Sequence, residues 1–371
     1  MMKKILSLVL ALAMSLALAA CAGGDTGSAD SDVTLDGADQ QTAVSDDESS
    51  DGNTDSNIAS DGANQEASAS GDESGAPSEV PDEVTITSLN GSGEAVELTV
   101  PYAPQRIAIL DMASLDILDA LGVGDRVVGT ADTSLEYLQG YINDEITNLG
   151  TIKEADLEAV MACEPDVIFI GGRLASSYDA LSEIAPVVYL ATDTELGVVE
   201  SVRQNATTIA SLFGLEAEVE ELMAQFDSRI QALAEVAEGH TAIVGLVTSG
   251  SFNVLGNDGR CSMICREIGY KNIGVDADID TSTHGNEASF EFIVEQDPDY
   301  IFVLDRDAAI QTEGAQLAQE VLENELVMGT RAYQDGHIVY LSSPAVWYTA
   351  EGGITALDIM LQDLENVLLS E

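Results

Sequence analysis

Two arginines of this chain stand at the same place in two similar segments. Arg173 ends the segment EAVMACEPDVIFIGGR, and Arg306 ends the segment EFIVEQDPDYIFVLDR. A guanidinium carries a permanent charge and a fork of N–H donors, so two of them at equivalent places suit the capture of an anion. At one constant spacing the two segments share Glu158, Pro165, Asp166, Ile168, Phe169 and Arg173 with Glu291, Pro298, Asp299, Ile301, Phe302 and Arg306.

The elements that must position these arginines are the same in both segments. Each segment begins as a short amphipathic helix, stops at a Pro-Asp pair and continues as a buried apolar strand that the arginine follows. Ligands of open α/β sheets bind outside the carboxyl ends of the strands. We therefore expect a repeated unit in two α/β lobes, with one arginine from each lobe facing a shared cleft. The alternative is that the two segments look alike because a helix, a Pro-Asp turn and an apolar strand are common in βα units. This alternative does not explain the matching glutamate and arginine.

The chain opens with an export signal. Lys3 and Lys4 precede an apolar run, and small residues lead to Cys21. The sequence LAAC at 18–21 resembles the bacterial lipobox, so residues 1–21 are predicted to be a lipoprotein signal peptide that ends at a lipidated Cys21. This implies anchoring at the extracytoplasmic face of the cell membrane, with an ordinary signal peptide as the alternative. The apolar run is too short to predict a permanent spanning helix.

Residues 22–83 consist largely of Asp, Ser, Gly, Ala and Glu and contain no Lys or Arg. Such a segment buries too little apolar surface to offset its ordering entropy, so it is predicted to be a disordered acidic tether, with an acidic interaction tail as the alternative. The whole chain has 66 acidic residues against 13 Lys plus Arg, a formal net charge of -53. This charge argues against a nucleic-acid partner.

The remaining chain predicts an α/β fold of two Rossmann-like lobes with the ligand cleft between them. Val-rich strands on either side of Asn90-Gly91 indicate a hairpin at the start of the first lobe. A long helical pattern, broken once at Gly214, follows that lobe. The predicted domains are an N-terminal lobe over 84–215, an interlobe helix over 216–238 and a C-terminal lobe over 239–371.

Other motifs indicate neither catalysis nor a zinc site. Gly122 and Gly124 follow a helix where a dinucleotide fingerprint must follow a strand, so they mark a helix end. The sequence has no G-x-S-x-G, H-E-x-x-H or phosphate loop. Cysteines and histidines lack zinc spacing. Cys261 and Cys265 share one face of an expected helix and are not expected to bridge each other, and the remaining cysteine is Cys163.

Five features together resemble those of a known family. They are the export signal, the acidic tether, the two lobes with repeated segments, the interlobe helix and the loop WYTAEGG before a terminal helix. This family is the helical-backbone class of ABC-transporter substrate-binding lipoproteins (class III, the periplasmic-binding-protein type 2 iron-siderophore family). The segments DRDAAI, HGNEASFE and WYTAEGG are most similar to binders of ferric catecholate siderophores. The resemblance covers roughly residues 84–371. Haem or cobalamin binders of the same class, and a chelatase- or esterase-type enzyme on this scaffold, are the alternatives.

The resemblance implies a monomeric binding protein, not an enzyme, that delivers a ferric siderophore to an ABC permease dimer with its ATPase and holds no permanent cofactor. It also implies that Arg173, Arg260 and Arg306 converge on the ligand. A ferric tris-catecholate is a compact trianion with its oxygens outward, and guanidiniums supply opposing charge and hydrogen bonds. A surface ion pair is the alternative for each arginine.

Further roles follow from the same resemblance. His284 and Tyr348 match positions that complete the coordination of iron when the siderophore is tetradentate. Trp347, placed in a loop bounded by Pro and Gly, stacks on a catechol ring or packs that loop, and both roles stay open. Glu158 and Glu291 match the carboxylates, one on each lobe, that dock on the permease, with a solvated helix face as the alternative.

Overall fold

The computed structural model describes residues 81–274 and 285–370, all of which belong to one structural unit, residues 76–371. The predicted signal peptide, Cys21 and nearly all of the tether lie outside the described residues, and so does His284. Within the described ranges, no helix has both the length and the apolar character needed to cross a membrane.

The N-terminal lobe is built on a parallel sheet with the strand order β5-β4-β3-β8-β9. Its central strands are buried on both faces, which explains their continuous apolar sequences. The hairpin expected at Asn90-Gly91 pairs β1 with β2. The elements are β1 (Glu83–Leu89), β2 (Ala95–Pro101), β3 (Ile107–Ile109), α1 (Met112–Ala120), η1 (Gly124–Arg126), β4 (Val127–Thr130), η2 (Glu136–Tyr141), β5 (Thr147–Asn148), β6 (Gly150–Thr151), β7 (Glu154–Ala155), α2 (Leu157–Ala162), β8 (Val167–Ile170), η3 (Gly172–Ser177), α3 (Tyr178–Ser182), β9 (Val187–Tyr189) and α4 (Val198–Ser211).

The C-terminal lobe is built on a second sheet with the order β13-β11-β10-β14-β15, in which β12 also pairs with β10. Strands β10, β14 and β15 are parallel, and β11 folds back antiparallel to β10. The elements are α5 (Glu216–Ala237), β10 (Thr241–Thr248), β11 (Ser251–Val254), α6 (Met263–Arg266), β12 (Lys271–Asn272), β13 (Asn286–Glu287), α7 (Phe290–Gln296), β14 (Tyr300–Asp305), α8 (Arg306–Ala309), α9 (Ala318–Leu322), η4 (Val327–Gly329), α10 (Arg331–Gln334), β15 (Ile338–Tyr340), α11 (Pro344–Thr349) and α12 (Ile354–Leu368).

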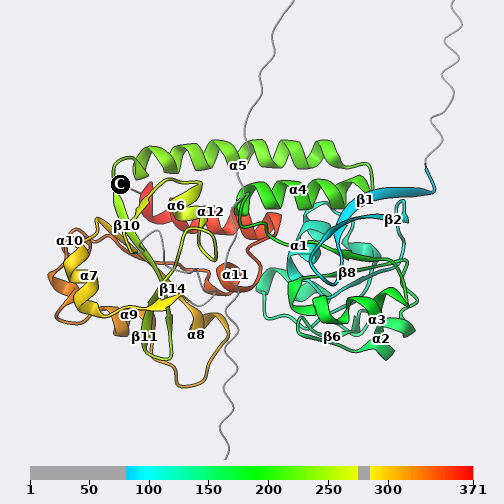
Figure 1. The fold of residues 1–371 in the computed structure, drawn as a ribbon, viewed down its shortest axis with the longest axis horizontal. Helices are drawn as coiled ribbons and strands as arrows, with labels where there is room; N and C mark the ends of the chain where they lie inside the picture. Colours follow the sequence, from blue (N-terminus) through cyan, green and yellow to red (C-terminus); the bar gives the residue numbers. More distant parts are fainter. Residues whose placement is uncertain (1–80, 275–284, 371) are drawn as a thin grey trace, which may run out of the picture. The chain divides into compact units, whose positions relative to one another are not determined.

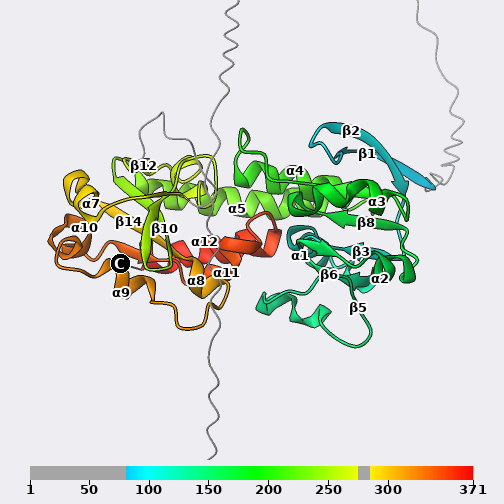
Figure 2. The ribbon, with the colours of Figure 1, turned by 60° about the horizontal axis from the view of Figure 1, so that its bottom comes forward.

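Helix α5 joins the two lobes and is the helix expected over 216–238. Gly214, which has a φ of +70°, separates it from α4, as the sequence predicted. Helix α12 packs against both α5 and α1, and the two long helices α5 and α12 lie side by side in both views (Figures 1 and 2). One core cluster includes side chains from the first sheet, α5, α12 and the second sheet. The lobes are therefore joined by packed side chains as well as by the chain itself.

The repeated segment is a structural repeat. Strand β8 lies between β3 and β9, and β14 lies between β10 and β15, so both copies occupy the equivalent place in their sheets. The preceding helices, α2 and α7, are each followed by a residue with left-handed backbone before the proline, Glu164 with φ +44° and Asp297 with φ +42°. Arg173 and Arg306 follow the carboxyl ends of β8 and β14, as predicted.

The aspartate of each Pro-Asp pair ties its repeat to a neighbouring strand of its sheet, β3 in the first lobe and β10 in the second. Oδ2 of Asp166 accepts hydrogen bonds from the backbone N–H groups of Gln105 and Arg106, at 2.7 and 2.9 Å. Oδ2 of Asp299 accepts the backbone N–H of Thr241 at 2.8 Å. Both carboxylates thus satisfy backbone donors that precede or begin a strand, which gives the repeated aspartate a structural role.

The helix expected around Cys261 and Cys265 is shorter than predicted. Helix α6 begins at Met263, and Cys261 lies before it with a φ of +60°, so the two cysteines do not share a helix face. Cys163, Cys261 and Cys265 are all free thiols. Burial raises the pKa of the Cys265 thiol to about 12 and raises that of Cys261 well above its ordinary value. These two thiols are therefore protonated and unreactive near neutral pH.

Candidate ligand-binding site

A cavity of about 190 Å³ lies between the lobes. The N-terminal lobe lines it with the start of α1, the turn after β8 and part of α4, and the C-terminal lobe lines it with Arg260 and residues 348–352. We call it the cleft cavity. Because β3 and β8 end beside it, it occupies the place where open α/β sheets bind ligands.

Arg173 lines the cleft cavity from the turn after β8 and is exposed. Asp111, which follows β3, lines the same cavity and accepts hydrogen bonds from the backbone N–H and hydroxyl of Ser114 at 2.9 and 2.8 Å. Burial raises the pKa of the Asp111 carboxyl, while the bonds from Ser114 and the charge of Arg173 act in the opposite direction. A Cβ at Gly171 would lie 2.4 Å from Oδ1 of Asp111, so this approach requires glycine.

Tyr348 is held by two guanidiniums. Cζ of Arg260 lies 4.1 Å from the centroid of its ring, and Cζ of Arg306 lies 5.6 Å from it. Nη2 of Arg260 donates to the carbonyl oxygen of Tyr348 at 3.0 Å, and Nε of Arg306 donates to its Oη at 3.0 Å. Cations over an aromatic face are attracted by its quadrupole. The two arginines and the tyrosine therefore form one unit, of which Arg260 and Tyr348 line the cleft cavity.

Arg306 reaches this unit from the side rather than lining the cavity. Its Nη1 donates to Oγ1 of Thr248 at 3.1 Å and to Oδ1 of Asp307 at 3.3 Å, and its side chain is 27% exposed. These contacts fix the guanidinium, which in turn fixes the hydroxyl of Tyr348. The two repeated arginines thus lie at one site, Arg173 on the wall and Arg306 behind Tyr348.

Glu351 contributes a buried carboxyl to the wall of the cleft cavity. Its Oε1 accepts the backbone N–H of Cys261 at 2.8 Å. Burial raises the pKa of Glu351 to about 7, although the N–H of Cys261 and the charge of Arg260 oppose the rise. A partly neutral Glu351 lowers the negative charge that an anionic ligand would meet beside Arg260.

Trp347 does not reach the cleft cavity. Its side chain is fully buried, and its Nε1 donates to Oδ2 of Asp363 at 3.0 Å. The segment expected to be a loop forms helix α11, in which successive side chains point about 100° apart. One of the two neighbouring aromatic residues therefore enters the core while Tyr348 faces the cavity. Of the two roles left open for Trp347, packing is the one that this geometry provides.

The remaining predicted residues lie elsewhere. Glu158 and Glu291 are exposed in the first turns of α2 and α7. His284 lies outside the described residues, so its part in iron coordination stays a prediction. In the part of the chain that the structure describes, no three or more His, Cys, Asp or Glu side chains are grouped to hold a metal ion.

Three residues of the site were missed by the sequence reasoning. Asp111 follows the buried strand β3 after Leu110, so the rule that pointed to Arg173 could have found it. Glu351 lies within the segment WYTAEGG, but no sequence pattern distinguishes it as a residue of the site. Asn205 lies on helix α4 and lines the cavity only because that helix packs beside the segment after β9, which no local pattern reveals.

Two α/β lobes, a joining helix and a cavity at the strand ends define a two-lobed solute-binding protein. The chain belongs to the periplasmic binding protein family, whose model matches residues 107–345.

Individual members of this family are similar over most of their length. The petrobactin-binding protein YclQ of Bacillus subtilis is 34% identical over 272 residues, which cover 72% of this chain and 84% of that protein. Its crystal structure has a TM-score of 0.71 at 33% identity and covers 78% of this chain and 100% of that one. The ferric-anguibactin-binding protein FatB of Vibrio anguillarum is 29% identical over 293 residues, 76% of this chain and 88% of its own. The catecholate-siderophore binding protein VctP of Vibrio cholerae has a TM-score of 0.69 at 30% identity, covering 76% of this chain and 100% of that one.

Proposed function

We propose that this protein is the extracytoplasmic solute-binding component of an ABC importer and that its ligand is a ferric siderophore of the catecholate type. The observation that carries the proposal is the gathering of three arginines at one interlobe cavity. Arg173 lines the cavity, and Arg260 and Arg306 hold Tyr348, which also lines it. The names of YclQ, FatB and VctP, all of which bind siderophores, support the same ligand class.

The chemistry of the cleft cavity suits a compact anion. Charge-assisted hydrogen bonds from guanidinium groups contribute about 1.5–3 kcal/mol each. Arg173 donates no hydrogen bond to another group of the described chain, so its fork of donors is available to a ligand. The net charge of -53 repels anions at a distance. Attraction therefore depends on the local concentration of guanidiniums inside the cavity, where water is partly excluded.

Tyr348 gives the site a second function when the siderophore supplies only four donor atoms. A tetradentate chelator leaves two coordination positions of iron open, and a phenol oxygen is a competent iron ligand. Oη of Tyr348 already accepts the N–H of Arg306, which fixes its position. We propose Tyr348 as one protein ligand in such complexes and His284 as the other. With either a hexadentate or a tetradentate siderophore, the iron is cargo that the protein delivers.

Delivery of the ligand needs two further features that the proposal includes. A lipidated Cys21, followed by the acidic segment over 22–83, holds the two lobes near the membrane surface. Glu158 and Glu291 dock the lobes on the permease dimer, whose ATPase drives uptake. In this role the protein binds the ferric siderophore and delivers it to the permease, and it catalyses no reaction.

A fluorescence titration tests the ligand class. Trp347 is the single tryptophan of the chain, is fully buried and precedes Tyr348 directly, so it reports on ligand bound at Tyr348. We expect hexadentate and tetradentate ferric catecholates to quench it with dissociation constants of about micromolar or below, whereas haem and cobalamin do not. Tight binding of haem or cobalamin alone, or turnover of a siderophore without a transporter, would contradict the proposal.

The Tyr348→Phe variant tests iron coordination separately. With a tetradentate ferric catecholate, we expect the charge-transfer band of the wild-type complex to shift in this variant, because a phenolate ligand is lost. With a hexadentate complex, the two spectra should agree. An identical band in both proteins with the tetradentate complex would remove Tyr348 from the coordination sphere.

A further inference from the structure

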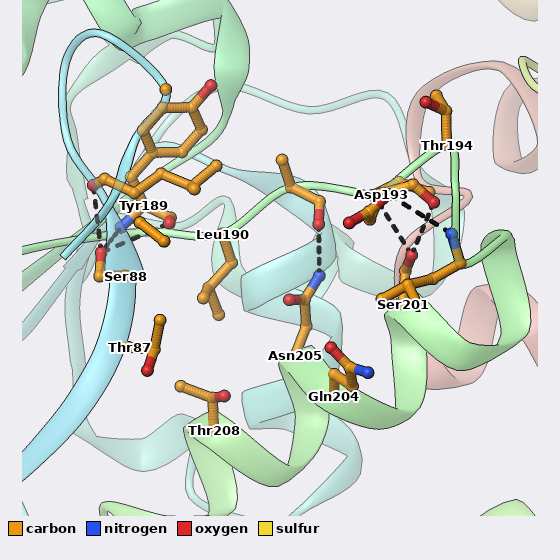
Figure 3. A pocket seen from close by; sticks show the side chains of 16 residues that line it. Thr87, Ser88, Tyr189, Leu190, Asp193, Thr194, Ser201, Gln204, Asn205 and Thr208 are labelled. Atoms are coloured by element: carbon orange, nitrogen blue, oxygen red, sulfur yellow. Dashed lines mark hydrogen bonds between the residues drawn. The ribbon is translucent and has the colours of Figure 1, made fainter. Parts of the chain in front are cut away.

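A second cavity adjoins the cleft cavity within the N-terminal lobe. It has a volume of about 470 Å³ and lies between the β1–β2 hairpin, residues 189–194 and helix α4 (Figure 3). We call it the hairpin pocket. Leu190, Ala191, Thr192 and Asn205 line both cavities, so the two hollows meet along that segment.

The lining of the hairpin pocket differs in charge from that of the cleft cavity. Among its described lining residues there is no lysine or arginine, and Asp193 is the one carboxylate. The rest of the wall combines aliphatic surface with hydroxyl and amide groups, including those of Thr87, Gln204 and Thr208 (Figure 3). An anionic iron-binding head has no counter-charge here. An aliphatic chain that carries amide or amine groups matches the wall instead.

Hydrogen bonds within the protein hold these walls in place before any ligand binds. Nδ2 of Asn205 donates to the carbonyl oxygen of Ala191 at 3.0 Å. The hydroxyl of Ser201 accepts the N–H of Asp193 at 2.9 Å. In the described part of the chain, Oδ1 of Asn205 and the hydroxyl of Thr208 have no protein partner. A preformed wall with unused polar atoms is typical of a ligand site.

Asp193 offers a charge to a cationic group. Its Oδ1 accepts the backbone N–H groups of Glu195 and Leu196 at 2.7 and 3.3 Å, which fixes the carboxylate. Oδ2 has no protein partner in the described part of the chain. A protonated amine that reaches the end of the pocket can therefore pair with Oδ2.

We propose that the hairpin pocket is a subsite for an aliphatic, amine-bearing arm of the siderophore whose iron-binding head occupies the cleft cavity. The proposal rests on the proposed function, because the head must bind in the cleft for its arm to cross the shared segment at Leu190 to Thr192. The subsite selects among chelators with the same head by the length and charge of the arm.

Two synthetic ferric complexes with the same bis-catecholamide head test this subsite. In one complex the linker nitrogen carries an aminobutyl arm, and in the other it carries a methyl group. The proteins compared are wild type, Thr208→Tyr, which fills the pocket, and Asp193→Asn, which keeps the acceptor for Glu195 and Leu196 but removes the charge. Thr207→Tyr is the matched control, because Thr207 is exposed on the same helix and does not line the pocket.

We expect wild type and Thr207→Tyr to bind the armed complex about tenfold more tightly than the methyl complex, the size of one charge-assisted contact. Thr208→Tyr should bind the two complexes with equal affinity. In Asp193→Asn, the logarithm of the affinity ratio between the armed and the methyl complex should fall by at least about half. Affinity for the methyl complex should be the same in all four proteins, which also shows that the variants fold. Equal affinity of wild type for both complexes, or a preference that survives both substitutions, would overturn the subsite. Failure of wild type to bind either complex would overturn the proposed function and the subsite with it.

Discussion

Arg306 acts on the ligand site through Tyr348, whose hydroxyl it holds, as well as through its charge. We expect Arg306→Ala to weaken binding of a ferric catecholate by about 10- to 100-fold, because one cation and one fixed hydrogen-bond network are lost. Quenching of Trp347 measures the affinity. Arg203→Ala is the control, since its guanidinium pairs with Glu200 and Asp227 on α4 and α5, away from the cavity. Equal losses in both variants, or none in Arg306→Ala, would remove Arg306 from the site.

Glu351 makes the site sensitive to pH near neutrality. Burial raises its pKa to about 7 from 4.5, so its contribution to folding is fully present below pH 4.5 and is lost as the pH rises through about 7. An anionic ligand also favours the neutral carboxyl. We therefore expect the affinity for a ferric catecholate to fall by up to about tenfold as the pH rises from about 6.5 to about 8.5.

Glu351→Gln separates this effect from the titration of the ligand. The glutamine keeps an oxygen that accepts the N–H of Cys261, so the loop is retained. Its affinity should stay nearly constant over the same pH range when measured by the same titration. If the two proteins show parallel pH profiles, the sensitivity belongs to the ligand or to another group.

At the scale of elements, helix α12 is anchored by a residue of the other lobe. Asp116, fully buried in α1, accepts the N–H groups of Thr355 and Ala356 at 2.7 and 2.8 Å and the hydroxyl of Tyr137 at 2.7 Å. It thus satisfies two free donors at the N-terminus of α12. A Cβ at Gly353 would lie 2.3 Å from Oδ2 of Asp116, so the second glycine of the Gly-Gly pair permits this contact.

Removal of the Asp116 carboxylate should therefore destabilise the fold. We expect Asp116→Ala to lower the free energy of unfolding by about 2–3 kcal/mol, because buried donors lose their acceptor. Urea denaturation followed by circular dichroism measures this change. Asp358→Ala removes an aspartate of α12 that pairs with Arg229 while partly exposed, and it should cost less than about 1 kcal/mol. Similar losses in the two variants would show that the bonds from Asp116 to α12 stabilise the fold no more than an exposed ion pair does.

The elements were predictable where local pattern decides them, and the contacts between distant segments were not. The buried strands, the helix end at Gly122 and the repeat follow from apolar spacing and turn residues, which depend only on neighbours along the chain. The burial of Trp347 depends on Asp363 in another helix. The cap that Asp116 forms depends on a helix more than two hundred residues away in sequence. Local spacing carries no information about either contact.

At the scale of the molecule, the lobes are connected at several points besides α5. The guanidinium of Arg266 donates to the carbonyl oxygens of Thr194 and Glu195, and Glu267 accepts the N–H of Val199 at 3.4 Å. Together with the shared core and the contact of α1 with α12, these bonds oppose a large rotation of one lobe against the other. In the proposed docking, the permease would recognise a body of nearly fixed shape, so fixed contacts on each lobe are sufficient.

Two exposed surfaces, one on each copy of the repeated segment, are available for the proposed docking. Glu158 in α2 has the exposed side chain of Met161 on the same helix, and Glu291 in α7 has the exposed side chain of Val294. A carboxylate beside an exposed apolar side chain suits a contact in which charge selects the partner and apolar burial adds affinity. Because the two copies belong to the structural repeat, they suit the proposed docking on a permease dimer.

The double variant Glu158→Ala/Glu291→Ala separates docking from binding. We expect wild-type affinity for a ferric catecholate, since neither residue lines the cleft cavity, and a loss of cellular uptake of more than about tenfold. Uptake of radioactive iron from the ferric siderophore measures the second quantity. Glu183→Ala/Glu320→Ala is the control, because it removes the same charge from exposed positions outside the repeat and should transport normally. Normal uptake by the first variant would assign both glutamates to the solvated surface, whereas equal loss in both would indicate that transport responds to net charge alone.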